Sequence, residues 1–108
     1  MILDWENDKE FALANGIEER TSAKEYEIVF CGDKFCDEYD LVIPFTYKDM
    51  AFKNFPTLSL SLGVYENCVF DNCPNIKIIG CEMVNCTFGH SRYTLESGSK
   101  LFKHKDND

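Results

Sequence analysis

Three consecutive segments of eighteen residues decide the fold: MAFKNFPTLSLSLGVYEN (50–67), CVFDNCPNIKIIGCEMVN (68–85) and CTFGHSRYTLESGSKLFK (86–103). Placed one under another, they align residues of the same kind in columns. These columns hold Phe52, Phe70 and Phe88; Met50, Cys68 and Cys86; Leu58 and Ile76; Leu60 and Ile78; Asn67 and Asn85. A fixed short period is typical of a solenoid, in which each repeat buries its apolar face by stacking on its neighbours.

The local pattern inside each repeat is that of a β-strand. In the run TLSLSL (57–62), apolar and polar residues alternate with the period of two expected of a strand with one buried face. Asparagine and glycine, which tolerate the positive φ of a tight corner, separate the apolar stretches at Asn67, Asn72, Gly80, Asn85 and Gly89. The sequence therefore predicts a mainly β fold, a short parallel β-solenoid with an eighteen-residue period.

The number of coils follows from extending the period in both directions. From Phe35, the apolar residues Leu41 and Ile43 follow at six and eight residues, which is the spacing of the later coils. In the last coil, Thr94 and Glu96 occupy the aliphatic positions, as a polar closing repeat would require. About four coils are expected.

The whole chain of 108 residues is predicted to be one domain. Residues 1–30 form an N-terminal cap that contains a helix and, because apolar residues alternate through 26–30, a strand. Residues 31–103 form the solenoid, and the polar residues 104–108 form a frayed tail.

The predicted helix of the cap spans residues 5–15. Asp4 is expected to be its N-cap and Gly16 its stop. Trp5 and Phe11 are expected to pack against the first coil and close the open end of the solenoid.

Two families of β-helix are similar to parts of this sequence. The runs CVFDNC (68–73) and CEMVNCTF (81–88) resemble pentapeptide-repeat proteins, in which a small residue and a Phe or Leu two places later point inward every five residues. The alternative is the hexapeptide left-handed β-helix, which has eighteen residues in each coil. That family would bury Phe52, Leu58, Val64, Phe70, Ile76 and Phe88. The hand of the coil stays open.

Charge is distributed unevenly along the chain. Residues 1–49 carry thirteen acidic and five basic side chains, whereas residues 50–108 carry six of each, so the net charge of −8 belongs to the first part. Such a field repels nucleic acid and attracts basic protein surfaces. The candidate partner-binding residues are therefore Glu18, Glu19, Asp33, Asp37, Glu38 and Asp40. The alternative is a solvated face that keeps a small protein soluble.

Six cysteines fall into three pairs of identical spacing: Cys31 and Cys36, Cys68 and Cys73, Cys81 and Cys86. The sequence starts without a basic region followed by an apolar core, so export is not expected and the thiols are predicted to be reduced. A zinc site built from the last two pairs is the alternative. A buried ladder of small side chains is favoured, and no metal or other cofactor is expected.

No catalytic motif is found, so the protein is predicted not to be an enzyme. The sequence has no nucleophile elbow, no glycine-rich phosphate loop and no HExxH. The histidines are His90, near a predicted corner, and His104, in the tail. The enzymatic alternative is an acyltransferase, because left-handed hexapeptide enzymes transfer acyl groups with a histidine.

The predicted function is that of a non-catalytic, acidic protein-binding module. Its resemblance to pentapeptide-repeat proteins implies an inhibitor that imitates DNA, since some of those proteins are acidic rods that look like DNA to topoisomerases. Phage anti-defence and anti-CRISPR proteins and immunity proteins follow the same electrostatic logic. The expected partner is the basic surface of a nucleic-acid-handling protein in the cytoplasm, or in the host cytoplasm if the chain is phage-encoded. No direct contact with nucleic acid or membrane is expected.

Overall fold

The computed structural model describes residues 1–21, 26–32 and 45–107. In chain order the described elements are β1 (Ile2–Asp4), α1 (Lys9–Ala14), β2 (Ile17–Thr21), β3 (Tyr26–Phe30), β4 (Phe45–Lys48), β5 (Ala51–Lys53), β6 (Leu58–Glu66), β7 (Val69–Asp71), β8 (Ile76–Val84), β9 (Thr87–Gly89), β10 (Tyr93–Glu96), β11 (Lys100–Phe102) and β12 (Lys105–Asn107).

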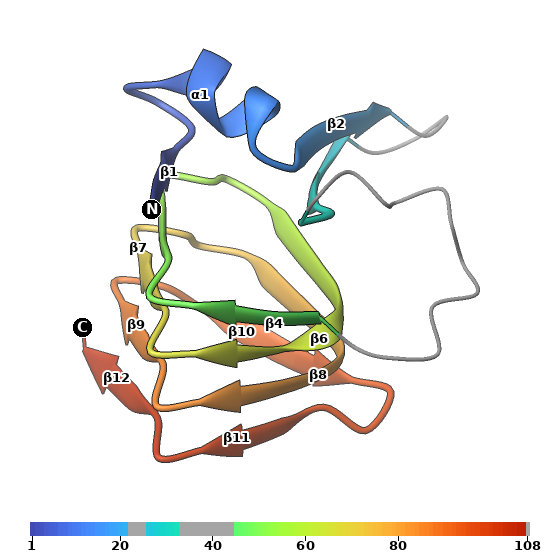
Figure 1. The fold of residues 1–108 in the computed structure, drawn as a ribbon, viewed down its shortest axis with the longest axis vertical. Helices are drawn as coiled ribbons and strands as arrows, with labels where there is room; N and C mark the ends of the chain where they lie inside the picture. The colour runs from blue at the N-terminus through green and yellow to red at the C-terminus, as the bar shows by residue number, and fades with distance from the viewer. Residues whose placement is uncertain (22–25, 33–44, 108) are drawn as a thin grey trace.

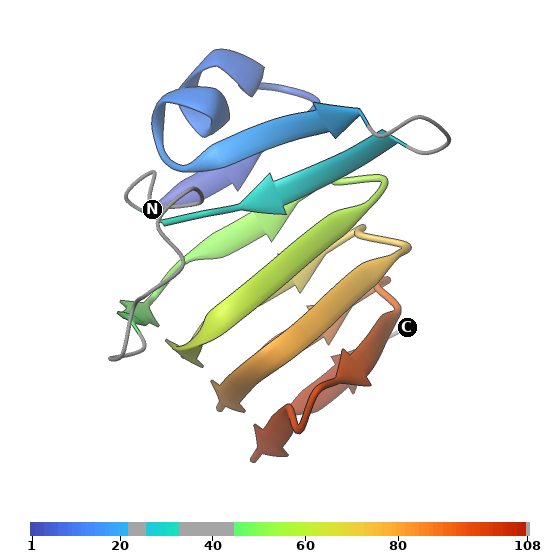
Figure 2. The same cartoon turned by 90° about the vertical axis from the view of Figure 1, so that its right-hand side faces the viewer.

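The strands stack into a parallel β-solenoid of about three turns, with a small helix at its N-terminal end (Figure 1). One sheet has the order β1-β5-β7-β9-β12, and the other has the order β10-β8-β6-β3-β2. The long strands β6 and β8 bend, so that their second halves pair with β4 and β11 on a further side of the coil. Figure 2 shows β3, β6 and β8 side by side below α1. The predicted β-solenoid with an eighteen-residue period is confirmed, with about three turns where about four coils were expected.

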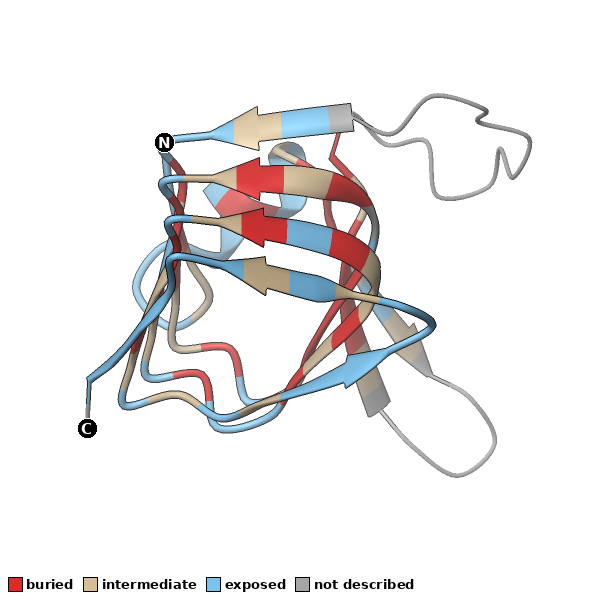
Figure 3. Cartoon of the chain, turned by 90° about the horizontal axis from the view of Figure 1, so that it is seen from below, coloured by how far each residue is buried: buried red, intermediate tan, exposed pale blue. Residues whose placement is uncertain are grey.

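The coils wind in a right-handed sense, as the views from the side and from the C-terminal end show (Figures 1 and 3). This is the usual hand of a crossover between parallel strands. The left-handed hexapeptide alternative is therefore wrong in hand. It is also wrong at Val64, which pairs with the exposed Glu82, while its neighbours Gly63 and Tyr65 are buried.

Residues with positive φ make the corners. Four of the five predicted corners have this conformation: Asn67, Asn72, Gly80 and Asn85. The fifth was expected at Gly89, but His90 adopts it with φ 48°. These corners are five, eight, five and five residues apart. The five-residue regularity that resembles pentapeptide repeats is thus interrupted on the long side of the coil.

Asparagines at equivalent corners of successive coils bond to one another. The side-chain amide of Asn72 donates to Asn54 at 2.9 Å, and that of Asn85 donates to Asn67 at 2.6 Å. Asparagine is suited to this place because its side chain continues the hydrogen bonding of the stack while its backbone tolerates positive φ.

The core consists of residues stacked in columns inside the coils (Figure 3). Phe52, Phe70 and Phe88 stack with ring centroids 4.9 and 5.1 Å apart and nearly parallel planes, which confirms the predicted column. On the next side, Leu60 pairs with Ile78 in the predicted register, and both are buried.

The first layer of the solenoid differs from the prediction. Leu3 of β1 is the register partner of Phe52, and Phe30 of β3 is that of Leu60. The segment from Phe35 through Ile43, which was assigned to the first coil, lies outside the described residues. The confirmed strand at 26–30 is therefore part of the solenoid and not of a separate cap.

The last coil also departs from the eighteen-residue register. Tyr93 pairs with Ile76 and Leu95 with Ile78, so the columns shift by one residue and Thr94 and Glu96 do not occupy the inward positions. The shift is compensated before β11, where Leu101 again lies eighteen residues after its partner Met83. Residues 104–108 were expected to fray, but β12 within them pairs in parallel with β9.

Four of the five described cysteines form the predicted buried ladder. Cys68, Cys73, Cys81 and Cys86 are buried and not disulfide-bonded, and each thiol lies within hydrogen-bonding distance of carbonyls two and twenty-one residues earlier. Ser91 and Ser99 also donate to carbonyls twenty-one residues earlier. Cys31 is disulfide-bonded, so the expectation of fully reduced cysteines is wrong there. Cys36 lies outside the described residues.

The N-terminal helix is shorter than predicted. It spans Lys9–Ala14, and its N-cap is Asp8, whose carboxylate accepts from the backbone N–H of Phe11 at 3.3 Å. Asp4 was expected in this role, but it ends β1, because residues 2–4 extend to pair with β5. Trp5 precedes the helix and stacks on Phe55 with ring centroids 5.7 Å apart, which confirms its predicted packing against the core.

Candidate protein-binding surface at the N-terminal end

The structure places two of the six candidate partner-binding acids. Glu18 and Glu19 lie on β2, next to the helix at the N-terminal end of the solenoid (Figure 1). The other four lie outside the described residues: Asp33, Asp37, Glu38 and Asp40.

Both β2 acids have basic neighbours. Glu18 lies 3.5 Å from Arg20, and Glu19 lies 2.5 Å from Lys9. The ammonium of Lys9 also lies 4.6 Å from the centroid of the Trp5 ring, which holds it beside β2. Exposed pairs of this kind contribute about 0–1 kcal/mol to stability. They leave the acids accessible while reducing their net field.

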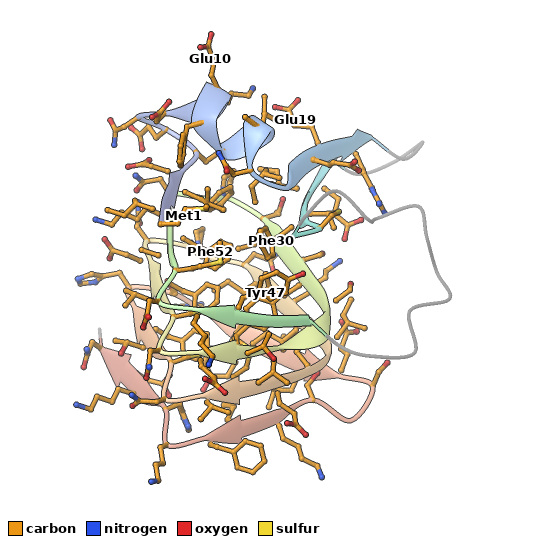
Figure 4. All side chains as sticks on the ribbon, in the orientation of Figure 1. Met1, Glu10, Glu19, Phe30, Tyr47 and Phe52 are labelled. Carbon is orange, nitrogen blue, oxygen red and sulfur yellow. The ribbon has the colours of Figure 1, made fainter. Side chains whose placement is uncertain are left out.

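More acidic side chains surround the helix. Glu6, Asp8 and Glu10 are exposed there, and within the described residues none of them forms an ion pair with a basic side chain. Glu10 and Glu19 point away from the solenoid, while Phe30 and Phe52 lie inside it (Figure 4). Residues 1–21 together carry six acidic and two basic side chains.

Two large apolar side chains of the helix are exposed among these acids. Phe11 is 42% exposed and Leu13 39%, whereas Ala12 between them is fully buried. We define the N-terminal surface as the exposed side chains that share this end of the molecule: Glu6, Asp8, Glu10, Phe11, Leu13 and Glu19.

Most of this surface was missed from the sequence. Phe11 was expected to pack against the first coil, but the helix starts at Lys9 and turns its buried face through Ala12, which leaves Phe11 outside. An available signal was the alternation of Glu6, Asp8 and Glu10 at the start of the helix, where acidic residues favour the positive end of the helix dipole.

Asp4 has a structural role at the base of this surface. Its carboxylate accepts from the backbone N–H groups of Glu6 and Asn7 and from the side-chain amides of Asn7 and Asn54, at 2.9–3.1 Å. Desolvation by itself would raise the pKa of Asp4, but these hydrogen bonds outweigh it and lower the pKa to about 2.

The depressed pKa predicts a pH-dependent contribution of Asp4 to stability. The stabilisation is present above the ordinary pKa of about 4 and is lost as the pH falls through the folded value near 2. Replacing Asp4 by alanine is expected to lower the free energy of unfolding by about 1–2 kcal/mol at pH 6. Urea unfolding of both proteins at pH 6 and pH 2 checks this. A loss of the same size at both pH values would contradict the role of the carboxylate charge.

A small hollow lies beside this surface, where the segments of the first coil meet. It encloses about 290 Å³ and is lined by Met1, Ala14, Asn15, Phe30, Gly32, Tyr47 and Met50. Figure 4 shows Met1, Phe30 and Tyr47 around it. The lining is mainly apolar, and it brings together no pair of carboxylates or histidines that would serve as acid and base.

The histidines do not form a catalytic arrangement. His90 is exposed at a corner, and His104 lies 3.3 Å from Asp106, which also accepts from the hydroxyl of Tyr93 at 3.2 Å. These residues close the C-terminal end of the core over Phe88, since the ring centroids of Phe88 and Tyr93 are 4.3 Å apart. In the described residues, no three or more His, Cys, Asp and Glu side chains converge as metal ligands.

The described part of the chain has no helix that is both long and apolar enough to cross a membrane. In comparisons with protein-family models, curated proteins and solved structures, no match to this chain was found.

Proposed function

We propose that this protein is a non-catalytic binding module that docks its acidic N-terminal surface on a basic surface of another protein. The observation that carries the proposal is the combination of exposed Phe11 and Leu13 with surrounding acids at one end of the solenoid. The opposite, C-terminal end of the solenoid has an excess of basic side chains. Residues 86–107 carry the bases Arg92, Lys100, Lys103 and Lys105 and the acids Glu96 and Asp106.

The two kinds of side chain would act at different stages of binding. Carboxylates attract a basic partner over about a Debye length and mainly raise the association rate. Exposed apolar side chains contribute at short range, where their burial slows dissociation. Scattered acids that serve solubility alone need no apolar centre, so the mixture favours a docking role.

The partner in this proposal is a nucleic-acid-binding protein in the cytoplasm, inhibited because the chain occupies the basic site that otherwise holds DNA or RNA. The precedent comes from pentapeptide-repeat proteins, which the two cysteine-containing runs resemble, since some members of that family are acidic rods that look like DNA to topoisomerases. Inhibitors of host defence, including anti-CRISPR proteins, and immunity proteins belong to the same class. The chain itself would contact neither nucleic acid nor membrane.

Pull-down from lysate at low and high salt tests the proposal. A specific partner with a basic nucleic-acid-binding site, retained at low salt and released at high salt, is the expected result. Recovery of a partner by a salt-independent, apolar contact would contradict the electrostatic part of the proposal.

Neutralising three acids of the N-terminal surface, together with Glu18 beside them on β2, should slow association with that partner. In the variant Glu6→Gln, Glu10→Gln, Glu18→Gln and Glu19→Gln, the association rate at low salt is expected to fall about 10-fold or more, with a flatter salt dependence and an unchanged fold. A second variant with amides at Asp33, Asp37, Glu38 and Asp40 tests the remaining candidate acids in the same way.

The matched control neutralises four acids outside residues 1–49: Glu66, Asp71, Glu82 and Glu96. It should affect association less, because residues 50–108 have balanced charge. Stopped-flow or surface plasmon resonance measures both rates. Equal effects of the acidic sets and the control would show that the N-terminal acids only solvate the protein.

A further inference from the structure

The last coil leaves inward positions uncovered at the C-terminal end of the solenoid. Leu95 of β10 is the register partner of Ile78, and Leu101 of β11 is that of Met83. Ile78 and Met83 are fully buried, whereas Leu95 is 43% exposed and Leu101 is half-buried. The difference arises because, within the described residues, β10, β11 and β12 pair on one side only. The C-terminal end therefore presents apolar side chains that a further layer could bury.

Basic side chains flank these apolar positions along the last coil. Four of them are exposed: Arg92, Lys100, Lys103 and Lys105. The same coil carries the acids Glu96 and Asp106, of which Asp106 is already bonded to His104 and Tyr93. We define the C-terminal surface by these exposed bases and the two uncovered leucines: Arg92, Leu95, Lys100, Leu101, Lys103 and Lys105.

The N-terminal surface has the same kind of composition with the opposite charge. Phe11 and Leu13 are exposed there, and the acids around them include Glu6 and Glu10, which form no ion pair within the described residues. The two surfaces lie at opposite ends of the solenoid, with α1 at one end and β11 and β12 at the other (Figures 1 and 2). One chain cannot bring them together, but two chains can.

We propose that this protein associates with a second copy of itself head to tail, with the C-terminal surface of one chain seated on the N-terminal surface of the next. Contacts between like ends would bring acids against acids or bases against bases, so a two-fold symmetric dimer through either end is disfavoured. Because the two surfaces face away from each other along the solenoid, the head-to-tail contact does not close. It extends into a linear row of chains.

The contact has the composition of an ordinary protein interface, with an apolar centre and a charged rim. Leu95 and Leu101 of one chain lie against Phe11 and Leu13 of the next, while the bases of the first chain face the acids of the second. The net charge of −8 does not prevent this contact. At about 0.15 M salt the Debye length is about 8 Å, so each end responds mainly to the end that it faces.

Self-association uses the surface through which the proposed docking on another protein would occur. A chain inside the row therefore withholds its N-terminal surface from that partner, and dilution or a tighter-binding partner releases it by mass action. Self-association is measured on the purified chain alone. Its absence would leave the outcome of the pull-down unaffected.

Sedimentation velocity of the purified chain at about 0.15 M salt tests the association, at concentrations from about 1 μM to 1 mM that cover weak interfaces. The weight-average mass of wild type is expected to rise with concentration beyond that of two chains, because each added chain offers a free end. A mass that stays at one chain, or that levels off at two, would overturn the proposal.

Two variants each block one end. The N-blocked variant carries Glu6→Lys and Glu10→Lys, and the C-blocked variant carries Leu95→Ser, Lys100→Gln and Lys105→Gln. All five side chains are exposed, so both variants are expected to fold, which circular dichroism checks. Each variant alone is expected to be monomeric, because it retains only one functional end. Self-association of either folded variant to the extent of wild type would contradict the head-to-tail contact.

An equimolar mixture of the two variants tests the pairing of the two surfaces directly. The intact C-terminal surface of the N-blocked variant can bind the intact N-terminal surface of the C-blocked variant once, and both remaining ends are blocked. The mixture is therefore expected to reach the mass of two chains and no more. A mixture that stays monomeric at concentrations where wild type associates would show that the two surfaces do not bind each other.

The matched control changes the same kinds of side chain on the sides of the solenoid, with Lys53→Gln, Val69→Ser and Lys77→Gln. These residues lie on β5, β7 and β8, between the two ends. The control should self-associate as wild type does, since both ends are intact. An equal loss of association in the folded control would overturn the assignment of the contact to the ends.

Discussion

Replacing Phe70 by alanine is expected to lower the free energy of unfolding by about 3–5 kcal/mol. The ring is fully buried and lies 4.9 Å from Phe52 and 5.1 Å from Phe88, centroid to centroid. Coils above and below hold these neighbours in place through backbone pairing, so the cavity cannot collapse. Equilibrium unfolding in urea, with an unchanged m-value, measures the loss.

Val69→Ala is the matched control for Phe70→Ala. Val69 lies on the same strand, but its side chain points outward and is 39% exposed. Its truncation should cost less than about 1 kcal/mol. A loss below about 1 kcal/mol for Phe70→Ala would contradict the stacked column and the eighteen-residue register that predicts it.

Gly16→Ala is the second substitution expected to destabilise the protein strongly, by at least about 2 kcal/mol. Gly16 has φ +100°, and a Cβ atom there would lie 1.9 Å from the carbonyl oxygen of Gly32. The carbonyl of Gly16 also accepts from the N–H of Cys31 at 2.6 Å. The two backbones approach closely where β2 begins after the helix, so a side chain must push them apart.

Gly98→Ala is the control that distinguishes the cost of the close contact at Gly16 from the cost of its positive φ. Gly98 also has positive φ, at +80°, but nothing lies within 4 Å of its added Cβ. It should cost only the strain of the left-handed region, about 1–2 kcal/mol. Thermal and urea unfolding of both variants measure the difference. Equal losses would show that the approach of Gly16 to Gly32 is not tight.

The middle of the solenoid was predictable because its determinants repeat. Phe52, Phe70 and Phe88 share one spacing, and the asparagine corners recur where positive φ is needed. The same local requirement, a buried ring or a corner with positive φ, therefore recurs in each coil and can be recognised from the repeat. A shift of one residue would have turned every inward side chain outward, so the register was strongly specified.

The ends were harder to predict, because their pairing is not periodic. β1 and β3 join the first layer from separate segments, and nothing in the alternation of 26–30 tells which strand it will pair with. In the last coil, the one-residue shift at Tyr93 is visible only in the pairing itself. The short strand β12 consists of polar residues, so its sequence does not distinguish it from a frayed polar tail.

The acidic charge of the candidate surface could be predicted from the sequence, but its exposed apolar side chains could not. The excess of acids in residues 1–49 follows directly from counting. The exposure of Phe11 and Leu13 depends on the residue at which the helix begins and on the face that it buries. The helix begins late because residues 2–4 pair with β5 and Asp8 caps the helix. The column of Cys68 and Cys86 was visible as aligned cysteines, but the bonding of their thiols to carbonyls of the preceding coil required the stacked structure.

The most direct test of the proposed function is a competition between this protein and duplex DNA for the partner recovered by pull-down. A labelled protein–partner complex is titrated with DNA at fixed low salt, and fluorescence anisotropy follows the release. The proposal predicts full displacement, with a midpoint set by the affinity of the partner for DNA. The neutralised variant Glu6→Gln, Glu10→Gln, Glu18→Gln and Glu19→Gln should be displaced by less DNA. A stable ternary complex of protein, partner and DNA would contradict the claim that the acidic N-terminal surface occupies the nucleic-acid site.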